Sequence, residues 1–450
     1  MEPSNGTLSR MQSISALVER HVGDAAFYWQ QHDKSGHSPL LTLGDLRAFD
    51  RILQAHLDGI EVSHSQGRRE ALQALQRWRG PGEMFVCASL AFRRTPQEAS
   101  KYWTEIASVL KTDPQRMLRG LISALLWGGP ESAAPWLTYF TQTNQPVEWQ
   151  VAAWRAIARN RSLAGISELP RRFEATITSE NPHLRAAAIR AAAYMNQVVN
   201  LDSVMRQNDP IATVEAAIFS FQQNGGSRES ALQALWHRVW QSLERLPTLT
   251  GAFKTIAIHR LIRWVRHLAL ATPRGHGDIN RLLGFLPSRL GLAFVLHHGD
   301  SQLLPWVKSQ LGNPECARLA GWTWSAMTGV DLEQQNLAFD PAAYDDAIAM
   351  PTDDLDPGLL LPNPAAIDQY PVSTSRQGLQ IVGRPISARV LTDVLLQAPQ
   401  GLRWIAAQRL NEFSAEINGV TVNTRAPFRQ QWQELSALRN RVFAQTQLAH

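Results

Sequence analysis

Two short stretches place histidine beside a carboxylate, which is a pairing used for metal binding and for acid–base catalysis. They are HHGD at 297–300 and HLDG at 56–59. Neighbouring side chains on a helix point about 100° apart, so His297 and His298 are poorly placed to bind one ion. Glycine commonly ends a helix, and histidine is favourable at that negatively polarised end. We therefore interpret both stretches as helix C-termini and not as catalytic or metal sites.

Other chemical motifs are incomplete or missing from the sequence. The acidic stretch 353–356 resembles half of a calcium-binding loop but lacks its glycine and its terminal glutamate. Cys87 and Cys316 match no metal or redox spacing, and we interpret them as buried hydrophobic residues. No Gly-rich phosphate loop, nucleophile elbow or metalloprotease helix motif occurs. The sequence predicts a protein that is not an enzyme, with no catalytic, cofactor-binding or metal-binding residues and no cofactor.

The charge is unevenly distributed along the 450 residues. The formal net charge is +5, yet no Lys or Arg occurs between Leu319 and Ser375, where nine Asp and Glu residues fall. Elsewhere the basic residues are thinly spread and form no dense cluster of the kind that neutralises a run of phosphates. We expect a solvated surface with one acidic patch, and no nucleic-acid partner.

The N-terminal residues 1–10 are polar and lack the apolar core of a secretory signal. No apolar run approaches the roughly 18 residues that a membrane-spanning helix needs. The sequence therefore predicts a cytoplasmic protein with no membrane partner.

The elements that must position any site are predicted to be helices. Apolar residues recur at helical spacing over 13–31 and again over 42–58, which predicts an N-terminal hairpin. From 67 to 329 one helical segment follows another. Four dipeptides begin such segments with a capping residue and a proline, an arrangement that satisfies the free amides of a first turn. They are Asp113-Pro114, Asn181-Pro182, Asp209-Pro210 and Asn313-Pro314.

Small residues follow these dipeptides at every third or fourth place and would let neighbouring helices approach closely. Asn181 and Asp209 are separated by about one short helix–turn–helix unit, whereas the other intervals are irregular. Degenerate repeats of this kind are typical of HEAT-like arrays. We predict an all-α, HEAT-like α-solenoid of antiparallel helix pairs, divided into an N-terminal hairpin (1–66), repeats (67–330), an acidic Pro-rich irregular segment (331–382) and a helical C-terminal region (383–450).

The C-terminal third has a different character. Prolines rule out a long helix between 331 and 371, so this segment is expected either to lie on the solenoid or to serve as a linker. Helices are predicted over 387–397 and 399–416, a short strand over 420–423, and a final helix from Pro427 with Trp432, Leu435, Leu438 and Val442 along one side.

Fifteen tryptophans are the most distinctive feature of the composition. Most should fill gaps between stacked helices, but any that face a concave surface would be anchors for a protein partner, because Trp and Arg dominate binding hot spots. Trp322 and Trp324 are two residues apart and point to different sides of one helix. We select Trp322, Trp324, Trp154 and Arg185 as candidate protein-binding residues.

Several stretches resemble a bacterial family of HEAT-repeat proteins that has no established activity. They are HVGDAAFYW at 21–29, LGDLRAFDR at 43–51, AHLDGI at 55–60, AGWTWSAMTGVDL at 320–332, GRP at 383–385, WIAAQRL at 404–410 and APFRQQ at 426–431. The resemblance extends over nearly the whole chain in order. It supplies no catalytic residues.

Members of that family are often encoded beside type VI secretion genes. The resemblance therefore implies an accessory role, as an adaptor that loads an effector or as a chaperone, with a secreted effector or spike-tip protein as the client. An immunity protein that neutralises a co-encoded toxin is an alternative. A HEAT-like DNA glycosylase or a chromophore lyase is the enzymatic alternative, and a glycosylase would need a basic concave face.

Overall fold

A computed structural model describes residues 14–166, 169–195, 197, 199, 201–206, 209–222, 228–340, 355–372, 378–414, 416–417 and 419–448. Helices dominate these residues, and the two strands are two residues long each, so the all-α prediction is confirmed. Contacts divide the chain into two units. The first comprises Met1–Ser35, Gly44–Ala175 and Arg425–Phe428, and the second comprises Gly36–Leu43, Thr176–Thr424 and Arg429–His450. The four predicted segments stay a prediction.

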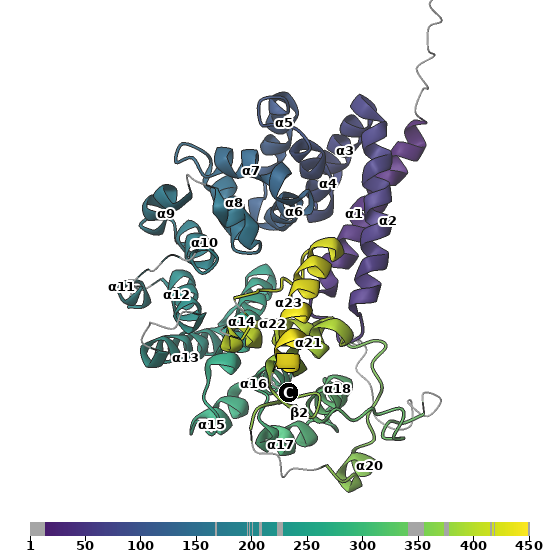
Figure 1. The fold of residues 1–450 in the computed structure, drawn as a ribbon, viewed down its shortest axis with the longest axis vertical. Coiled ribbons are helices and arrows are strands. Elements are labelled where there is room, and N and C mark those ends of the chain that lie inside the picture. The colour runs from purple at the N-terminus through teal and green to yellow at the C-terminus, as the bar shows by residue number, and fades with distance from the viewer. Residues whose placement is uncertain are drawn as a thin grey trace, which may run out of the picture. The chain divides into compact units, whose positions relative to one another are not determined.

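The first unit is built of helices, some of which pack side by side with the next helix but one along the chain. Its helices are α1 (Ser15–Ser35), α2 (Leu43–Val62), α3 (His64–Trp78), α4 (Pro81–Phe92), α5 (Ser100–Leu110), α6 (Pro114–Trp127), α7 (Gly129–Phe140), α8 (Val147–Ile157), the 3-10 turn η1 (Arg161–Gly165) and α9 (Leu169–Ile177). Helix α6 lies between α4 and α8 (Figure 1). The α4–α6 crossing is close because Gly120 has no side chain: a Cβ there would collide with the carbonyl oxygen of Pro81.

Buried hydrogen bonds of His32 and Asp50 join α1 and α2 to the segment 425–428. His32 Nδ1 lies 2.6 Å from Asp50 Oδ1, and the backbone amide of Phe428 donates to Asp50 Oδ2 at 2.5 Å. His32 Nε2 lies 3.3 Å from the carbonyl oxygen of Arg425. One carboxylate therefore fixes both the hairpin and a segment distant in sequence.

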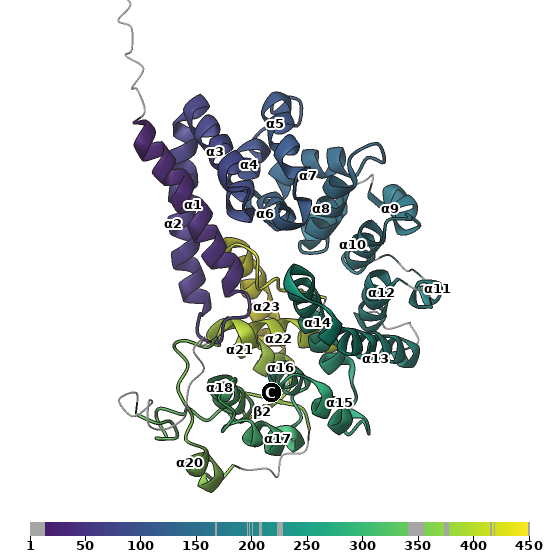
Figure 2. The same ribbon diagram turned by 180° about the vertical axis from the view of Figure 1, so that it is seen from behind.

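The second unit contains the remaining helices. They are α10 (Pro182–Ala192), α11 (Asp202–Met205), α12 (Pro210–Gln222), α13 (Arg228–Arg245), η2 (Leu246–Thr248), α14 (Gly251–Ala271), α15 (Ile279–Phe285), α16 (Ser288–His298), η3 (Ser301–Leu303), α17 (Leu304–Ser309), α18 (Ala317–Thr328), α20 (Pro364–Gln369), α21 (Ala388–Gln397), α22 (Gln400–Arg409), η5 (Leu410–Phe413) and α23 (Phe428–Leu448). Helices α10, α12, α14, α16 and α18 pack in succession (Figure 2).

Three of the four predicted helix starts are confirmed. Asp113 caps α6, Asn181 caps α10 with bonds from the amides of residues 183 and 184, and Asp209 Oδ1 accepts from the amide of Ile211 at 3.0 Å. The prediction for Asn313 is wrong, because α18 begins at Ala317. Asn313 instead accepts from the amide of Glu315, two residues on, and so closes a local turn that precedes the helix.

The two His-containing stretches differ in structure. Helix α16 ends at His298, followed by Gly299 with a φ of 77°, so the first stretch is a helix C-terminus as predicted. The interpretation of 56–59 is wrong, since α2 continues through Gly59 to Val62. Apolar packing of Leu57 and Ile60 carries the helix past the glycine.

The described part of the acidic segment lies on α16 and α18. Arg289 makes two 2.6 Å bonds to Asp356, and Phe339 donates its amide to the carbonyl of Leu361 at 2.9 Å. Pro362 packs on Gly321 of α18. The half calcium loop lies partly outside the described residues, and its last carboxylate, Asp356, forms a salt bridge with an arginine.

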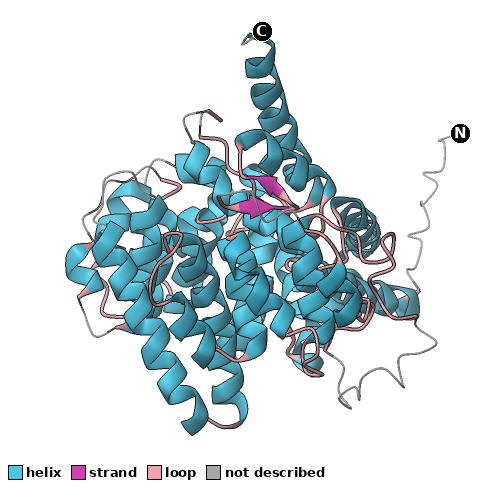
Figure 3. Cartoon of the chain, turned by 90° about the horizontal axis from the view of Figure 1, so that it is seen from below, coloured by secondary structure: helices cyan, strands magenta, loops and turns pink. Residues whose placement is uncertain are grey.

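A small antiparallel hairpin was not predicted. Strand β1 (Gln380–Ile381) pairs with β2 (Arg384–Pro385) around Gly383, whose φ is 68° (Figure 3). The strand predicted over 420–423 is wrong, since the described residues there have no strand pairing. Helices α21 and α23 agree with the predicted C-terminal helices, whereas α22 ends at Arg409, short of the predicted end at 416. Trp432 is 50% exposed and so does not share the buried side of α23.

Candidate binding cleft

A cavity of about 800 Å³ opens within the second unit. It is lined by residues of α12, α13 and α14, by residues 272–274, by Leu379 and by the α22–η5 corner. We call this cavity the cleft. Its lining is Ile218, Phe221, Arg228, Glu229, Leu232, His267, Leu270, Ala271, Thr272, Pro273, Arg274, Leu379, Gln408, Arg409, Asn411, Glu412 and Ser414.

Arg409 lines the cleft and links α22 to the C-terminal end of α16. Its Nη2 donates to the carbonyl oxygens of His297 and His298 at 3.0 Å each, which satisfies groups left unpaired at the end of α16. Its Nη1 donates to Glu412 Oε1 at 2.7 Å. Arg409 is 3% exposed, so the main role of its guanidinium is to hydrogen-bond these segments to one another. Arg274 is also paired, with its Nε 3.2 Å from Asp300 Oδ2.

A buried ion cluster joins α10, α12 and α14. Glu215 is 2% exposed and accepts from Arg190 at 2.5 Å and from Arg263 at 2.6 and 3.0 Å. We call these three residues the Glu215 cluster. Burial opposes ionisation, but the two arginines outweigh it and lower the pKa of Glu215 to about 2. Burial lowers the pKa of Arg263 to about 10, so its guanidinium stays charged at neutral pH.

Arg266 lies one turn further along α14 and has no such partner. None of the described residues gives it an ion pair or a hydrogen bond, and its Nε is buried without a partner. Burial lowers the pKa of Arg266 to about 10, which still leaves it a cation at neutral pH.

Histidines surround the indole of Trp404 on α22. The ring centroids of His37, His267 and His297 lie 5.4, 5.6 and 5.3 Å from that of Trp404. Burial, then the charge of Arg263, lowers the pKa of His267 well below its usual range. Burial, then the charge of Arg266, does the same to the pKa of His297. At neutral pH these two imidazoles are therefore uncharged and do not repel the neighbouring arginines.

The candidate tryptophans do not all reach the surface. Trp154 and Trp324 are each 0% exposed and belong to the cores of the first and second unit, so we no longer regard them as contact residues. Their helices present these positions to neighbouring helices, which spacing along one helix cannot reveal. Trp322 is partly exposed and packs against Gly401. It stays a candidate, although it does not line the cleft.

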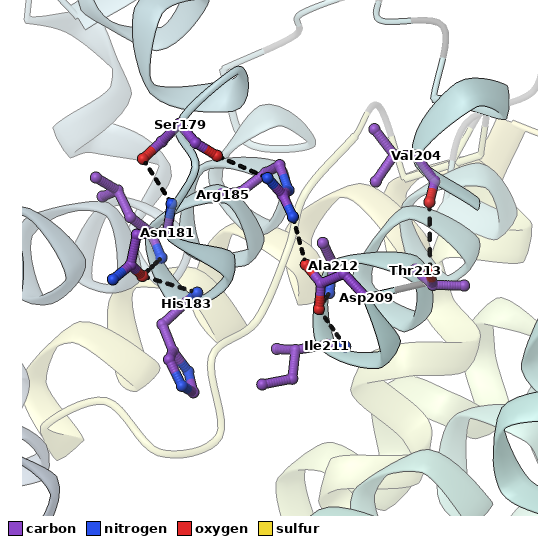
Figure 4. A network of polar contacts seen from close by, with 10 residues as sticks. Ser179, Asn181, His183, Arg185, Val204, Asp209, Ile211, Ala212 and Thr213 are labelled. Atoms are coloured by element: carbon purple, nitrogen blue, oxygen red, sulfur yellow. Dashed lines mark hydrogen bonds and ion pairs between the residues drawn. The ribbon is translucent and has the colours of Figure 1, made fainter. Parts of the chain in front are cut away.

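Arg185 links two successive helix starts in the second unit. Its Nη2 donates to Asp209 Oδ2 at 2.7 Å, and its Nη1 donates to the carbonyl oxygen of Ser179 at 2.7 Å (Figure 4). Because Asp209 also caps α12, one arginine on α10 is tied to the start of the next long helix. Arg185 is therefore engaged in joining helices and is poorly available to a partner.

Sequence reasoning missed His267 and Leu270, which line the cleft, and the ion-paired Arg263 one turn before them. Arg263, His267 and Leu270 are spaced four and three residues apart, which places them on one face of α14. That spacing was a usable signal. The carboxylate at Glu215 lies about 50 residues away in sequence, and no local pattern pairs it with them.

A smaller cavity of about 310 Å³ lies in the first unit, lined in part by Trp29, Trp78, Asp33 and Glu83. Burial opposes ionisation of Asp33, but bonds and charge from Arg119 lower its pKa, so this carboxylate is already neutralised. The smaller size and the engaged acid make this the weaker candidate.

No other group in the described residues indicates metal chemistry or membrane insertion. No set of three or more His, Cys, Asp or Glu residues there is arranged to hold a metal ion. Within the same residues no helix combines the length and apolarity needed to cross a bilayer. Both cysteines are buried, as predicted, and burial raises the pKa of Cys87 to about 12.

Comparison with known proteins finds no matching family model, no matching curated protein and no matching solved structure.

Proposed function

We propose that the chain is a non-catalytic protein-binding scaffold that holds a segment of a client polypeptide in the cleft. The observation that carries the proposal is the lining of the cleft, which combines half-buried apolar side chains with exposed charged ones. The half-buried apolar residues, which we call the floor, include Phe221, Leu232 and Leu270, and the exposed charged residues, which we call the rim, include Arg228 and Glu412. Peptides are commonly bound in helical grooves in this way, with apolar side chains in pockets and polar groups at the edges.

The arrangement of helices also supports this proposal. The succession α10–α12–α14–α16–α18 and the succession α4–α6–α8 are what a HEAT-like α-solenoid would place along one layer. Arrays of this type present long surfaces to extended clients. We therefore retain the HEAT-like solenoid as the proposed architecture of the repeats.

The class of client comes from the sequence resemblance. We propose a secreted effector or a spike-tip protein of a type VI secretion system, with the chain acting in the cytoplasm as a loading adaptor or chaperone. An adaptor or chaperone binds such a client and later releases it. Noncovalent binding in a cleft with an exposed rim allows that release.

Co-expression of the full chain with candidate clients tests the proposal. We expect a stable complex on size-exclusion chromatography, lost in Leu232→Glu, which places a charge on the cleft floor. Leu17→Glu is the matched control, because Leu17 lies on α1 and is 49% exposed. Separate elution of the chain from every candidate client would overturn the proposed function. Retention of the complex in Leu232→Glu would exclude the cleft as the binding surface.

A further inference from the structure

Two histidines of the first unit meet between α1 and α2, which lie side by side (Figures 1 and 2). His21 Nδ1 lies 2.9 Å from His56 Nδ1, and the two ring centroids are 5.1 Å apart. The centroids are thus only 2.2 Å further apart than the nitrogens, which is about twice the distance of a ring nitrogen from the centre of its own ring. The two nitrogens therefore point almost directly at each other. We call these two residues the histidine pair.

The distance between the facing nitrogens fits a shared proton. Hydrogen bonds donated by N–H groups are typically about 2.7–3.2 Å long. A metal ion on the line between the nitrogens would lie closer to each than the roughly 2.0 Å of a metal–imidazole bond. One Nδ1 must therefore carry a proton and donate it, while the other must be free of a proton and accept.

The neighbouring side chains of α1 indicate which ring accepts. Asp24 Oδ2 lies 3.9 Å from Nε2 of His56 and 3.6 Å from Nε of Arg20. This carboxylate favours a proton on Nε2 of His56, which leaves Nδ1 of His56 as the acceptor and His21 as the donor. The phenol ring of Tyr28 stacks on the imidazole of His56, with centroids 5.9 Å apart.

The carboxylates of α2 after His56, and the one that α3 directs at α1, have partners of their own. Asp58 pairs with Arg93, Glu61 pairs with Arg94, and Glu70 accepts from the hydroxyl of Ser15. The charges that act on His56 are those of Asp24, His21 and Arg20. Burial lowers the pKa of His56, the charges of His21 and Arg20 act in the same direction, and Asp24 opposes them.

We propose that the histidine pair is a proton-sensitive contact, which joins α1 to α2 while one of the facing nitrogens is free of a proton and opens when both imidazoles are protonated. In the doubly protonated state two N–H donors and two positive charges would face each other, with no acceptor between them. The folded pKa of His56 is the lower one, so the stability contributed by the pair is fully present above about pH 6.5 and is lost as the pH falls through the folded value.

The other end of this hairpin, nearest the connection between the two helices, responds differently to acid. There His32 faces the carboxylate of Asp50, so protonation of that imidazole would leave an ion pair and not two like charges. His32 lies about three turns along α1 from His21. Acid would therefore separate α1 from α2 at the histidine pair and leave them joined at His32.

A double-mutant cycle measured at two pH values tests the proposal. The full chain, His21→Phe, His56→Phe and the double variant are unfolded in urea at about pH 7.5 and at about pH 5. At the higher pH we expect the two substitutions to be coupled by about fivefold in the unfolding equilibrium constant, the ordinary contribution of one hydrogen bond. At the lower pH the coupling should vanish or change sign.

His237→Phe supplies the matched control, because His237 is an exposed histidine on α13 of the second unit. Combined with His56→Phe, it should show no coupling at either pH. Equal coupling of His21 and His56 at both pH values, or none at the higher one, would overturn the proposal.

Amide hydrogen exchange of the unchanged chain provides a second test if a variant does not fold. After correction for the intrinsic effect of pH, residues 15–24 and 54–62 should lose protection several-fold more than residues 28–35 and 43–50 between about pH 7.5 and about pH 5. A uniform loss along the hairpin, or a greater loss near His32, would refute the proposal. The histidine pair belongs to the first unit and the cleft to the second, so neither result bears on the proposed function.

Discussion

The substitution Glu215→Gln tests whether one buried carboxylate compensates the charges of both arginines in the Glu215 cluster. Glutamine is nearly the same size and can still accept a hydrogen bond, so little packing is lost. The substitution removes the negative charge and leaves Arg190 and Arg263 facing each other in a buried setting. Breaking a buried ion pair by removing one partner typically costs about 3–5 kcal/mol, and we expect a loss of unfolding free energy in that range at pH 7.

The pH dependence gives a second measure of the same interaction. The pKa of Glu215 is about 2 in the folded chain against an ordinary value of 4.5. Because the folded pKa is the lower one, the stability contributed by this carboxylate is fully present above about pH 5 and is lost as the pH falls towards 2. The two values differ by an amount equivalent to about 3 kcal/mol. By about pH 3.5 roughly 1.5 kcal/mol of this should be lost.

The glutamine variant lacks this titration, so the stability gap between the two chains should narrow as the pH falls. Urea unfolding followed by circular dichroism measures the gap. Hydrogen exchange of α10, α12 and α14 assigns it to the second unit. Glu244→Gln, on the exposed surface of α13, is the matched control and should change stability by less than about 0.5 kcal/mol.

A Glu215→Gln chain within about 1 kcal/mol of the original at pH 7 would refute the view that this carboxylate compensates both arginines. A gap that stays constant down to about pH 3 would refute the lowered pKa.

Two further pairs of substitutions test the packing. Gly120→Ala should destabilise the first unit by several kcal/mol, because its Cβ would meet the carbonyl of Pro81 across the α4–α6 crossing. Gly23→Ala, in open space on α1, should be neutral or stabilise by about 0.5–1 kcal/mol. Equal changes in unfolding free energy for Gly120→Ala and Gly23→Ala, measured by urea unfolding, would contradict the close α4–α6 crossing. Trp324→Ala should cost about 3–5 kcal/mol, since the side chain is 0% exposed. Trp322→Ala should cost clearly less unfolding free energy, also measured by urea unfolding. A larger loss for Trp322→Ala than for Trp324→Ala would contradict the placement of these two side chains.

Local residue patterns in the sequence were sufficient to predict the helices and most of the helix ends discussed above. A capping residue followed by proline acts within one turn, so Asp113, Asn181 and Asp209 begin helices as predicted. Gly299 ends α16 for a similarly local reason. Asn313 shows the limit of this reasoning, because an asparagine that accepts an amide bond can close a turn as readily as it can start a helix.

The site depended on contacts that no local pattern contains. Trp154 and Trp322 have the same residue type and similar helical surroundings, yet only the packing of neighbouring helices decides that one is 0% exposed and the other partly accessible. The sequence by itself determined an all-helical chain with capped elements, because propensity and capping act over a few residues. Tertiary structure alone decided that Glu215 serves two arginines while Arg266 has none, because charges far apart in the chain interact only where folding brings them together in a medium that screens them poorly.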